Sequence, residues 1–151
     1  MENKNDEKDN NVNLTILNEI NKSAKMGMDS ISYVLKKVGE ENMKENLVFQ
    51  YSEYGKIIDK INTQFEKYGE VPDETPVTTK MMGYTGIELN TIKDKSNSHI
   101  AEMMIQGGEM GIVECQKLLN HNPNADVEVK NILNDFMTMQ KNDMEKMKTF
   151  L

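Results

Sequence analysis

The sequence contains no arginine and no tryptophan among its 151 residues, and it has only one cysteine and three prolines. Without arginine there is no planar guanidinium to hold a phosphate or a guanine through two parallel hydrogen bonds. All 18 basic residues are lysines, and the net charge is −7 at pH 7. Because nucleic-acid binding needs a basic surface, we expect no nucleic-acid partner.

The single cysteine, Cys115, excludes an internal disulfide and fits a reducing compartment. No apolar run approaches the roughly 18 residues that a membrane-spanning helix needs. The first residues also lack the apolar segment of a signal peptide. Together these absences predict a cytoplasmic protein with no membrane partner.

Two stretches of the chain repeat apolar residues three and four positions apart. The first contains Leu17, Ala24, Met28, Ile31, Leu35 and Val38, and the second contains Leu47, Tyr51, Tyr54, Ile58, Ile61, Phe65 and Tyr68. This spacing puts an apolar stripe along one face of each helix, and other helices must cover the stripe. The sequence therefore predicts an all-α four-helix bundle, whose core is rich in methionine because aromatic residues are only 6% and methionines number 13.

Composition and helix-ending residues set the expected boundaries. Residues 1–12 carry almost no apolar side chains and are expected to form a disordered tail, which leaves 13–151 as one helical-bundle domain. Helices are expected over 13–38 and 42–68, the second closed by Gly69. The turn between them is short, so the two helices should be antiparallel.

The third helical region is the hardest to divide. One helix over 76–120 would be about 67 Å long at 1.5 Å per residue, far longer than the others. We expect it to be long, kinked or broken, and two weak points are the polar cluster 94–98 and the pair Gly107-Gly108. A break near Ser96 is favoured over an unbroken helix. The final helix is expected over 126–150, with an inner side formed by Val129, Ile132, Phe136, Met139 and Met147.

The segment from His99 to Leu118 is apolar over more than half of its circumference. One stripe contains Ile100, Met104, Gly107, Gly111, Cys115 and Leu118, and a second band contains Ile92, Met103, Met110 and Val113. A surface helix of a monomer needs only one stripe about 100° wide. We therefore expect the 92–113 face to contact a second copy of the protein, most simply in a dimer.

The same segment holds the candidate functional residues. His99 and Glu102 are three positions apart, so they are neighbours on a helix and could share a proton or a metal ion. Glycines in an apolar stripe allow close packing or leave room for a ligand. The residues we single out as a ligand or interface site are His99, Glu102, Met103, Gln106, Gly107, Met110 and Gly111. Cys115 is expected to be an inert core thiol, because burial and Glu114 both raise its pKa.

Four helices of about 25 residues in a small acidic protein resemble the ferritin-like superfamily. In this resemblance, residues 76–93 would form the long crossover between two helical pairs. Di-iron members carry Glu-x-x-His on two helices, and this chain has only the reversed run His99-Ile-Ala-Glu102. The resemblance therefore implies architecture without a di-iron centre. The apolar spacing does not say which helices pair, so a ferritin-like and an up-down-up-down arrangement both stay open. The run DKSNSHIAEMMIQGGEMGI (94–112) also resembles a stretch in small uncharacterised bacterial helical proteins related to that superfamily.

Three function hypotheses follow. The first is a non-enzymatic helical bundle that self-associates or binds a partner through the 92–113 face and needs no cofactor. The alternative is a metal-binding ferritin-like protein with a degenerate site around His99 and Glu102, holding iron or another transition metal. An enzyme ranks last, because the sequence shows no phosphate loop, no oxyanion hole and no nucleophile beside a base.

Overall fold

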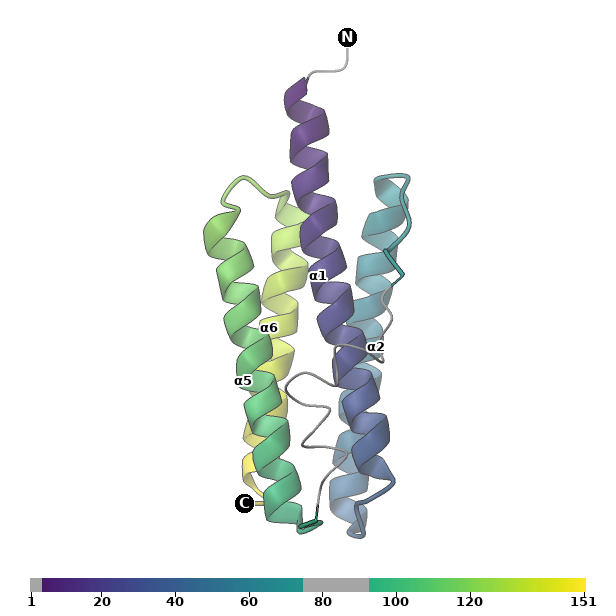
Figure 1. Ribbon diagram of the computed structural model, residues 1–151, viewed down its shortest axis with the longest axis vertical. Coiled ribbons are helices and arrows are strands. Elements are labelled where there is room, and N and C mark those ends of the chain that lie inside the picture. The colour runs from purple at the N-terminus through teal and green to yellow at the C-terminus, as the bar shows by residue number, and fades with distance from the viewer. Residues whose placement is uncertain (1–3, 75–92) are drawn as a thin grey trace.

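The structure, a computed structural model, describes residues 4–74 and 93–151, and every regular element in these ranges is an α-helix (Figure 1). The helices are α1 (Lys4–Leu35), α2 (Glu41–Lys67), α5 (Asn97–His121) and α6 (Val127–Lys148). The most extensive packing is between α5 and α6 and between α1 and α2. The predicted all-α four-helix bundle is confirmed. None of the described helices combines the length and apolar character that crossing a bilayer requires.

The helix directions give the bundle its topology. In Figure 1, α1 and α6 run in one direction, and α2 and α5 run in the other. Cross-bundle contacts agree, because Lys60 of α2 pairs with Asp135 of α6 and the later Tyr68 pairs with the earlier Asp126. The described end of α2 and the start of α5 therefore lie at opposite ends of the bundle. This is the ferritin-like arrangement, and the up-down-up-down alternative is wrong.

The first helix starts earlier than the sequence predicted. It begins at Lys4, inside the segment 1–12 that we expected to be disordered, and its N-terminal part projects beyond the neighbouring helices (Figure 1). The side chains of residues 6–11 are exposed, so no apolar pattern marked this part of the helix. Asp6 and Glu7 lie in its first turn, where acidic side chains interact favourably with the helix dipole.

The end of α2 follows the prediction closely. Gly69 has φ +67°, a left-handed conformation that glycine adopts without steric cost. The next residue, Glu70, donates its backbone N–H to the carbonyl of Phe65 at 3.1 Å, which satisfies one of the last free carbonyls of the helix. The α1–α2 turn is also short, although α1 ends at Leu35 rather than at Val38.

The predicted break near Ser96 is confirmed. Ser96 is the N-cap of α5, and its Oγ accepts a hydrogen bond from the backbone N–H of His99 at 3.3 Å. The Ser96 backbone N–H donates to Asp94 Oδ1 at 2.8 Å, which lowers the pKa of Asp94. The second weak point does not interrupt the helix, because Gly107 and Gly108 both lie within α5. The predicted crossover over 76–93 lies almost entirely outside the described residues.

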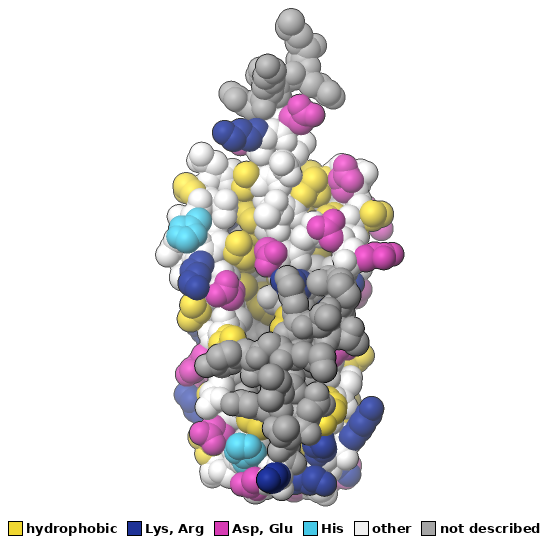
Figure 2. Space-filling model, in the orientation of Figure 1, with side chains coloured by type: hydrophobic (Ala, Val, Ile, Leu, Met, Phe, Trp, Pro, Cys, Tyr) yellow, Lys and Arg dark blue, Asp and Glu magenta, His cyan; other side chains and the backbone are white. Residues whose placement is uncertain are grey.

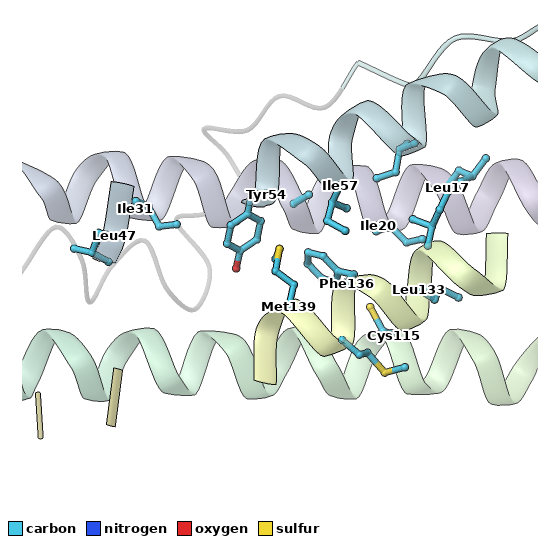
Figure 3. Packing of buried hydrophobic residues seen from close by; sticks show 14 of the residues in the cluster. Leu17, Ile20, Ile31, Leu47, Tyr54, Ile57, Cys115, Leu133, Phe136 and Met139 are labelled. Atoms are coloured by element: carbon cyan, nitrogen blue, oxygen red, sulfur yellow. The ribbon is translucent and has the colours of Figure 1, made fainter. Parts of the chain in front are cut away.

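The core is built from one face of each helix (Figure 3). The predicted stripe of α1 is correct in position, since Leu17, Ala24, Ile31 and Val38 are all buried. The stripe of α2 is displaced, because Tyr51 is 39% exposed while Gln50, Ile57 and Gln64 are buried. Gln50 and Gln64 also fit the three-four spacing of the buried face, but because they are polar we did not assign them to it.

Candidate functional site

The outer face of α5 lies opposite the buried side of the helix, although its Met103 also packs partly against the core. It consists of residues spaced alternately four and three positions apart, His99, Met103, Gln106, Met110 and Val113. Met110 is 47% exposed and Val113 is 51% exposed, while Met103 is half-buried. On the opposite side of the same helix, Ala101, Gly108 and Cys115 are buried against the core. The helix therefore has apolar side chains on two opposite faces.

The glycines of α5 do not lie as predicted. Gly107 was expected in the inner stripe, but a Cβ at this position would meet nothing within 4 Å. Gly108 is the buried one, because it is in line with Ala101 and Cys115, seven residues away on either side. Gly111 does face inward, at ordinary contact distance from Gln140 and Phe136. The predicted site residues thus divide between two faces of the helix.

The predicted pair of His99 and Glu102 does form. Nδ1 of His99 lies 3.8 Å from Oε2 of Glu102, and the two side chains are 39% and 59% exposed. Within 4–74 and 93–151, no group of three or more His, Cys, Asp or Glu side chains could hold a metal ion. Among the described residues, the pair therefore has two exposed metal-ligand atoms that compete with water, and no third His, Cys, Asp or Glu side chain joins them.

A second arrangement lies in the middle of the bundle, and we did not predict it from the sequence. We call Tyr54, Gln140 and Asp143 the polar layer. Gln140 Nε2 donates a hydrogen bond to Tyr54 Oη at 2.6 Å, and the Tyr54 hydroxyl points from α2 into the interior (Figure 3). Two glycines make room for it. A Cβ on Gly27 of α1 would lie 2.3 Å from the Tyr54 ring, and one on Gly108 of α5 would lie 3.2 Å from Gln140 Oε1.

Asp143 is the unusual member of the polar layer. It is 5% exposed, and its Oδ2 has no hydrogen-bond partner in the described part of the chain. Burial raises the pKa of Asp143 to about 6, against the opposing charge of Lys146, and the charge of Glu53 adds to the rise. Burial likewise raises the pKa of Tyr54 to about 12, although the hydrogen bond from Gln140 acts in the other direction. Near neutral pH the layer therefore contains a neutral phenol and a buried, ionised carboxylate.

The spacing of residues along α6 contained a signal for the burial of Asp143, but its polarity argued against a buried position. The buried face of α6 contains Val129, Ile132, Phe136, Met139 and Met147 as predicted. The step from Met139 to Met147 skips one position, and Asp143 fills it. Reading the three-four spacing without regard to polarity would have placed Asp143 inside.

Cys115 matches its prediction. The side chain is 2% exposed, and burial together with the charge of Glu114 raises the pKa of the thiol to about 12. A thiol with this pKa is almost entirely protonated at neutral pH, so it is a poor nucleophile.

The charged surface shows no dominant sign on the face drawn in Figure 2, where acidic and lysine side chains are interspersed with apolar ones.

No protein-family model matches the chain, and no curated protein matches it in sequence. Two solved structures are similar in fold. One is a DUF305 fragment from Deinococcus radiodurans, with a TM-score of 0.72 and 13% identity, covering 91% of this chain and 93% of that one.

The other is described as a dodecameric thioferritin, the bacterioferritin-related protein from Bacteroides fragilis. Its TM-score is also 0.72 at 11% identity, covering 91% of this chain and 83% of that chain. At these identities the likeness establishes the fold, and the predicted resemblance to ferritin-like architecture is confirmed.

Proposed function

We propose that this protein is a non-enzymatic helical bundle that self-associates through the outer face of α5, with a dimer as the simplest assembly. The observation that carries the proposal is the exposure of Met110 and Val113 in the middle of a helix whose opposite side is already buried. A helix that packs on one bundle needs one apolar stripe, and α5 has a second. Covering the second stripe with another helix would remove its apolar surface from water.

The spacing along the outer face supports pairing with a helix of the same kind. Met103, Gln106, Met110 and Val113 alternate at three and four positions, which is the spacing by which two helices interlock their side chains. A two-fold dimer uses the same patch on both copies, so one such face is sufficient. The dodecameric state of the thioferritin neighbour is consistent with assembly of bundles of this architecture.

Analytical ultracentrifugation of the full chain tests the proposal. We expect the unaltered protein to sediment as a defined dimer or larger assembly, and the double variant Met110→Lys/Val113→Lys to sediment as a monomer with unchanged helical circular dichroism. Lysine at these positions would put charges into the apolar contact. The matched control is Val48→Lys, because Val48 is a mid-helix valine on α2 with a similar exposure of 56%.

Three results would overturn the proposal. The first is a strictly monomeric unaltered protein at high concentration. The second is an assembly that survives the double substitution on α5. In the third, Val48→Lys dissociates the assembly and the α5 variant does not, which would place the contact on α2.

A further inference from the structure

The seam between the lower halves of α2 and α6 holds an ionisable side chain at a position of apolar type. We define the lower seam as residues 43–54 of α2 and 139–148 of α6, which are connected by the Gln140–Tyr54 hydrogen bond and by Lys146 over the ring of Phe49. Met43, Leu47 and Met147 in this seam are each 0% exposed. Asp143 shares the buried face of α6 with Met147, at 5% exposure, and its Oδ2 has no partner in the described part of the chain.

The surroundings offer the carboxylate little compensation. The charges acting on it are Glu53 from α2 and Lys146 from its own helix, and the neighbouring Tyr54 of α2 is a neutral phenol. Lys146 is turned towards an aromatic ring, since its Nζ lies 3.8 Å from the centroid of Phe49. Gly27 of α1 lies against Tyr54 and Gly108 of α5 lies against Gln140, and neither glycine brings a charge to the polar layer. A buried charge without a close counter-ion or a complete set of hydrogen bonds destabilises the packing around it.

We propose that Asp143 is a proton-controlled latch of the lower seam, which is closed when the carboxyl is protonated and loosened when the carboxyl is ionised. A neutral carboxyl needs no counter-charge and is tolerated between packed helices. An ionised one gains hydration when α2 and α6 separate locally, so ionisation favours opening. The raised pKa of Asp143 supports this direction. Opening would expose Met43, Leu47 and Met147, and so create an apolar surface that the closed bundle hides.

Hydrogen exchange of the native full-length protein at about pH 4.5 and about pH 7.5, corrected for the intrinsic rates, tests the latch. We expect amides of the lower seam to lose protection by more than tenfold at the higher pH, because the pKa of Asp143 is about 6 in the closed seam and would return towards 3.8 on opening. Amides in the upper halves of the same helices, residues 57–67 and 127–136, should change by less than about twofold.

Two substitutions on α6 distinguish the latch from a general pH effect. Asp143→Asn keeps the shape of the side chain and removes the ionisation, so protection in the lower seam should become independent of pH. Asp135→Asn is the matched control, because Asp135 also faces α2 but is exposed and paired with Lys60 at 2.8 Å. This control should retain the pH dependence of the unaltered protein.

The proposal concerns a different surface from the outer face of α5 and stands independently of self-association. It is overturned if protection in the lower seam of the unaltered protein is the same at both pH values. It is equally overturned if Asp143→Asn keeps the pH dependence, or if both halves of the helices lose protection equally. Because the first and third results come from the unaltered protein, the test does not depend on how well a variant folds.

Discussion

Two tyrosines, Tyr54 within α2 and Tyr68 at its C-terminal end, form hydrogen bonds to α6 or to the residue before it. The polar groups at these two levels of the bundle differ in how fully they are partnered. At the upper level, Tyr68 hydrogen-bonds the carboxylate of Asp126, and the backbone N–H of Asp126 donates to Oδ1 of Asn13 at 2.8 Å. In the polar layer, Tyr54 is bonded to Gln140, but Oδ2 of Asp143 has no partner. We call the first group, Asn13, Tyr68 and Asp126, the upper network.

The difference teaches where a polar contact stabilises a bundle. The upper network lies at the start of α6, where Tyr68 and Asp126 are half-buried and water reaches both. The polar layer lies between four helices, where the surrounding medium is less polar and an unpartnered group is costly. A tyrosine and an aspartate therefore help to connect α1, α2 and α6 in the upper network. In the polar layer a tyrosine and an aspartate also occur, but the aspartate is a destabilising charge.

The largest expected effect comes from removing that charge. Asp143→Asn should raise the free energy of unfolding by roughly 3 kcal/mol near neutral pH, since each pKa unit of the upward shift from 3.8 to about 6 corresponds to about 1.4 kcal/mol. The folded-state pKa of about 6 is above the ordinary value of 3.8, so the contribution of Asp143 to stability is present below about pH 4 and is lost as the pH rises through 6. The gain should therefore be small in acid.

Urea unfolding at several pH values measures this gain. Asp126→Asn in the upper network is the comparison, and it should give no increase in stability at any pH. An equal gain from both substitutions would mean that the two levels do not differ.

The next effect comes from making the same change at both tyrosines. Tyr54→Phe should destabilise the protein by about 1–3 kcal/mol, because it leaves the buried Gln140 amide without its acceptor. Tyr68→Phe should cost less than about 1 kcal/mol, because water can replace the hydroxyl at the half-buried Asp126. Thermal unfolding of both variants gives the ranking, and a reversed order would contradict our interpretation of the two levels.

Adjacent glycines of α5 test how tightly the polar layer is enclosed. Gly108→Ala should destabilise by about 1 kcal/mol or more, since its Cβ would lie 2.8 Å from Cγ of Met144. Gly107→Ala should stabilise by up to about 1 kcal/mol, because the site is open and alanine favours a helix. Chemical denaturation of the pair provides the measurement. If both substitutions raised the free energy of unfolding, the polar layer would have room for an added methyl group at Gly108.

The smallest effect is expected away from both levels, at the exposed pair. Replacing His99 and Glu102 together by alanine should change the free energy of unfolding by less than about 0.5 kcal/mol, because exposed ion pairs contribute little. The same variant tests the metal hypothesis. If Zn(II) or Fe(II) raises the melting temperature of the unaltered protein but not of the variant, the pair is a metal site after all.

Much of the fold could be predicted from local signals. The three-four spacing identified the helices, Gly69 marked the end of α2, and the capping group around Ser96 marked the start of α5. The outer face of α5 could also be predicted, since Met103 and Met110 stood outside the inner stripe. These signals act within one or two helical turns, so the sequence alone is enough to read them.

The polar layer could not be predicted in the same way. Gln50 and Asp143 fit the buried spacing of their helices, but their polarity argued for an exposed position. Their burial depends on groups that are distant in the sequence, among them the small residues Gly27 and Gly108. The wrong choice of Gly107 over Gly108 as the inward glycine has the same cause. Neighbouring residues on a helix are about 100° apart, and only the packing of the other helices shows which of the two faces inward.

The amino-acid sequence by itself therefore determined that this chain forms amphipathic helices, where most of them end, and that α5 carries more apolar surface than one bundle needs. Only the tertiary structure decided the ferritin-like order of the helices, the rotation of α2 about its axis, and the burial of Asp143. The physical reason is that periodicity fixes which side chains share a face, whereas the packing of distant helices decides which face is withdrawn from water.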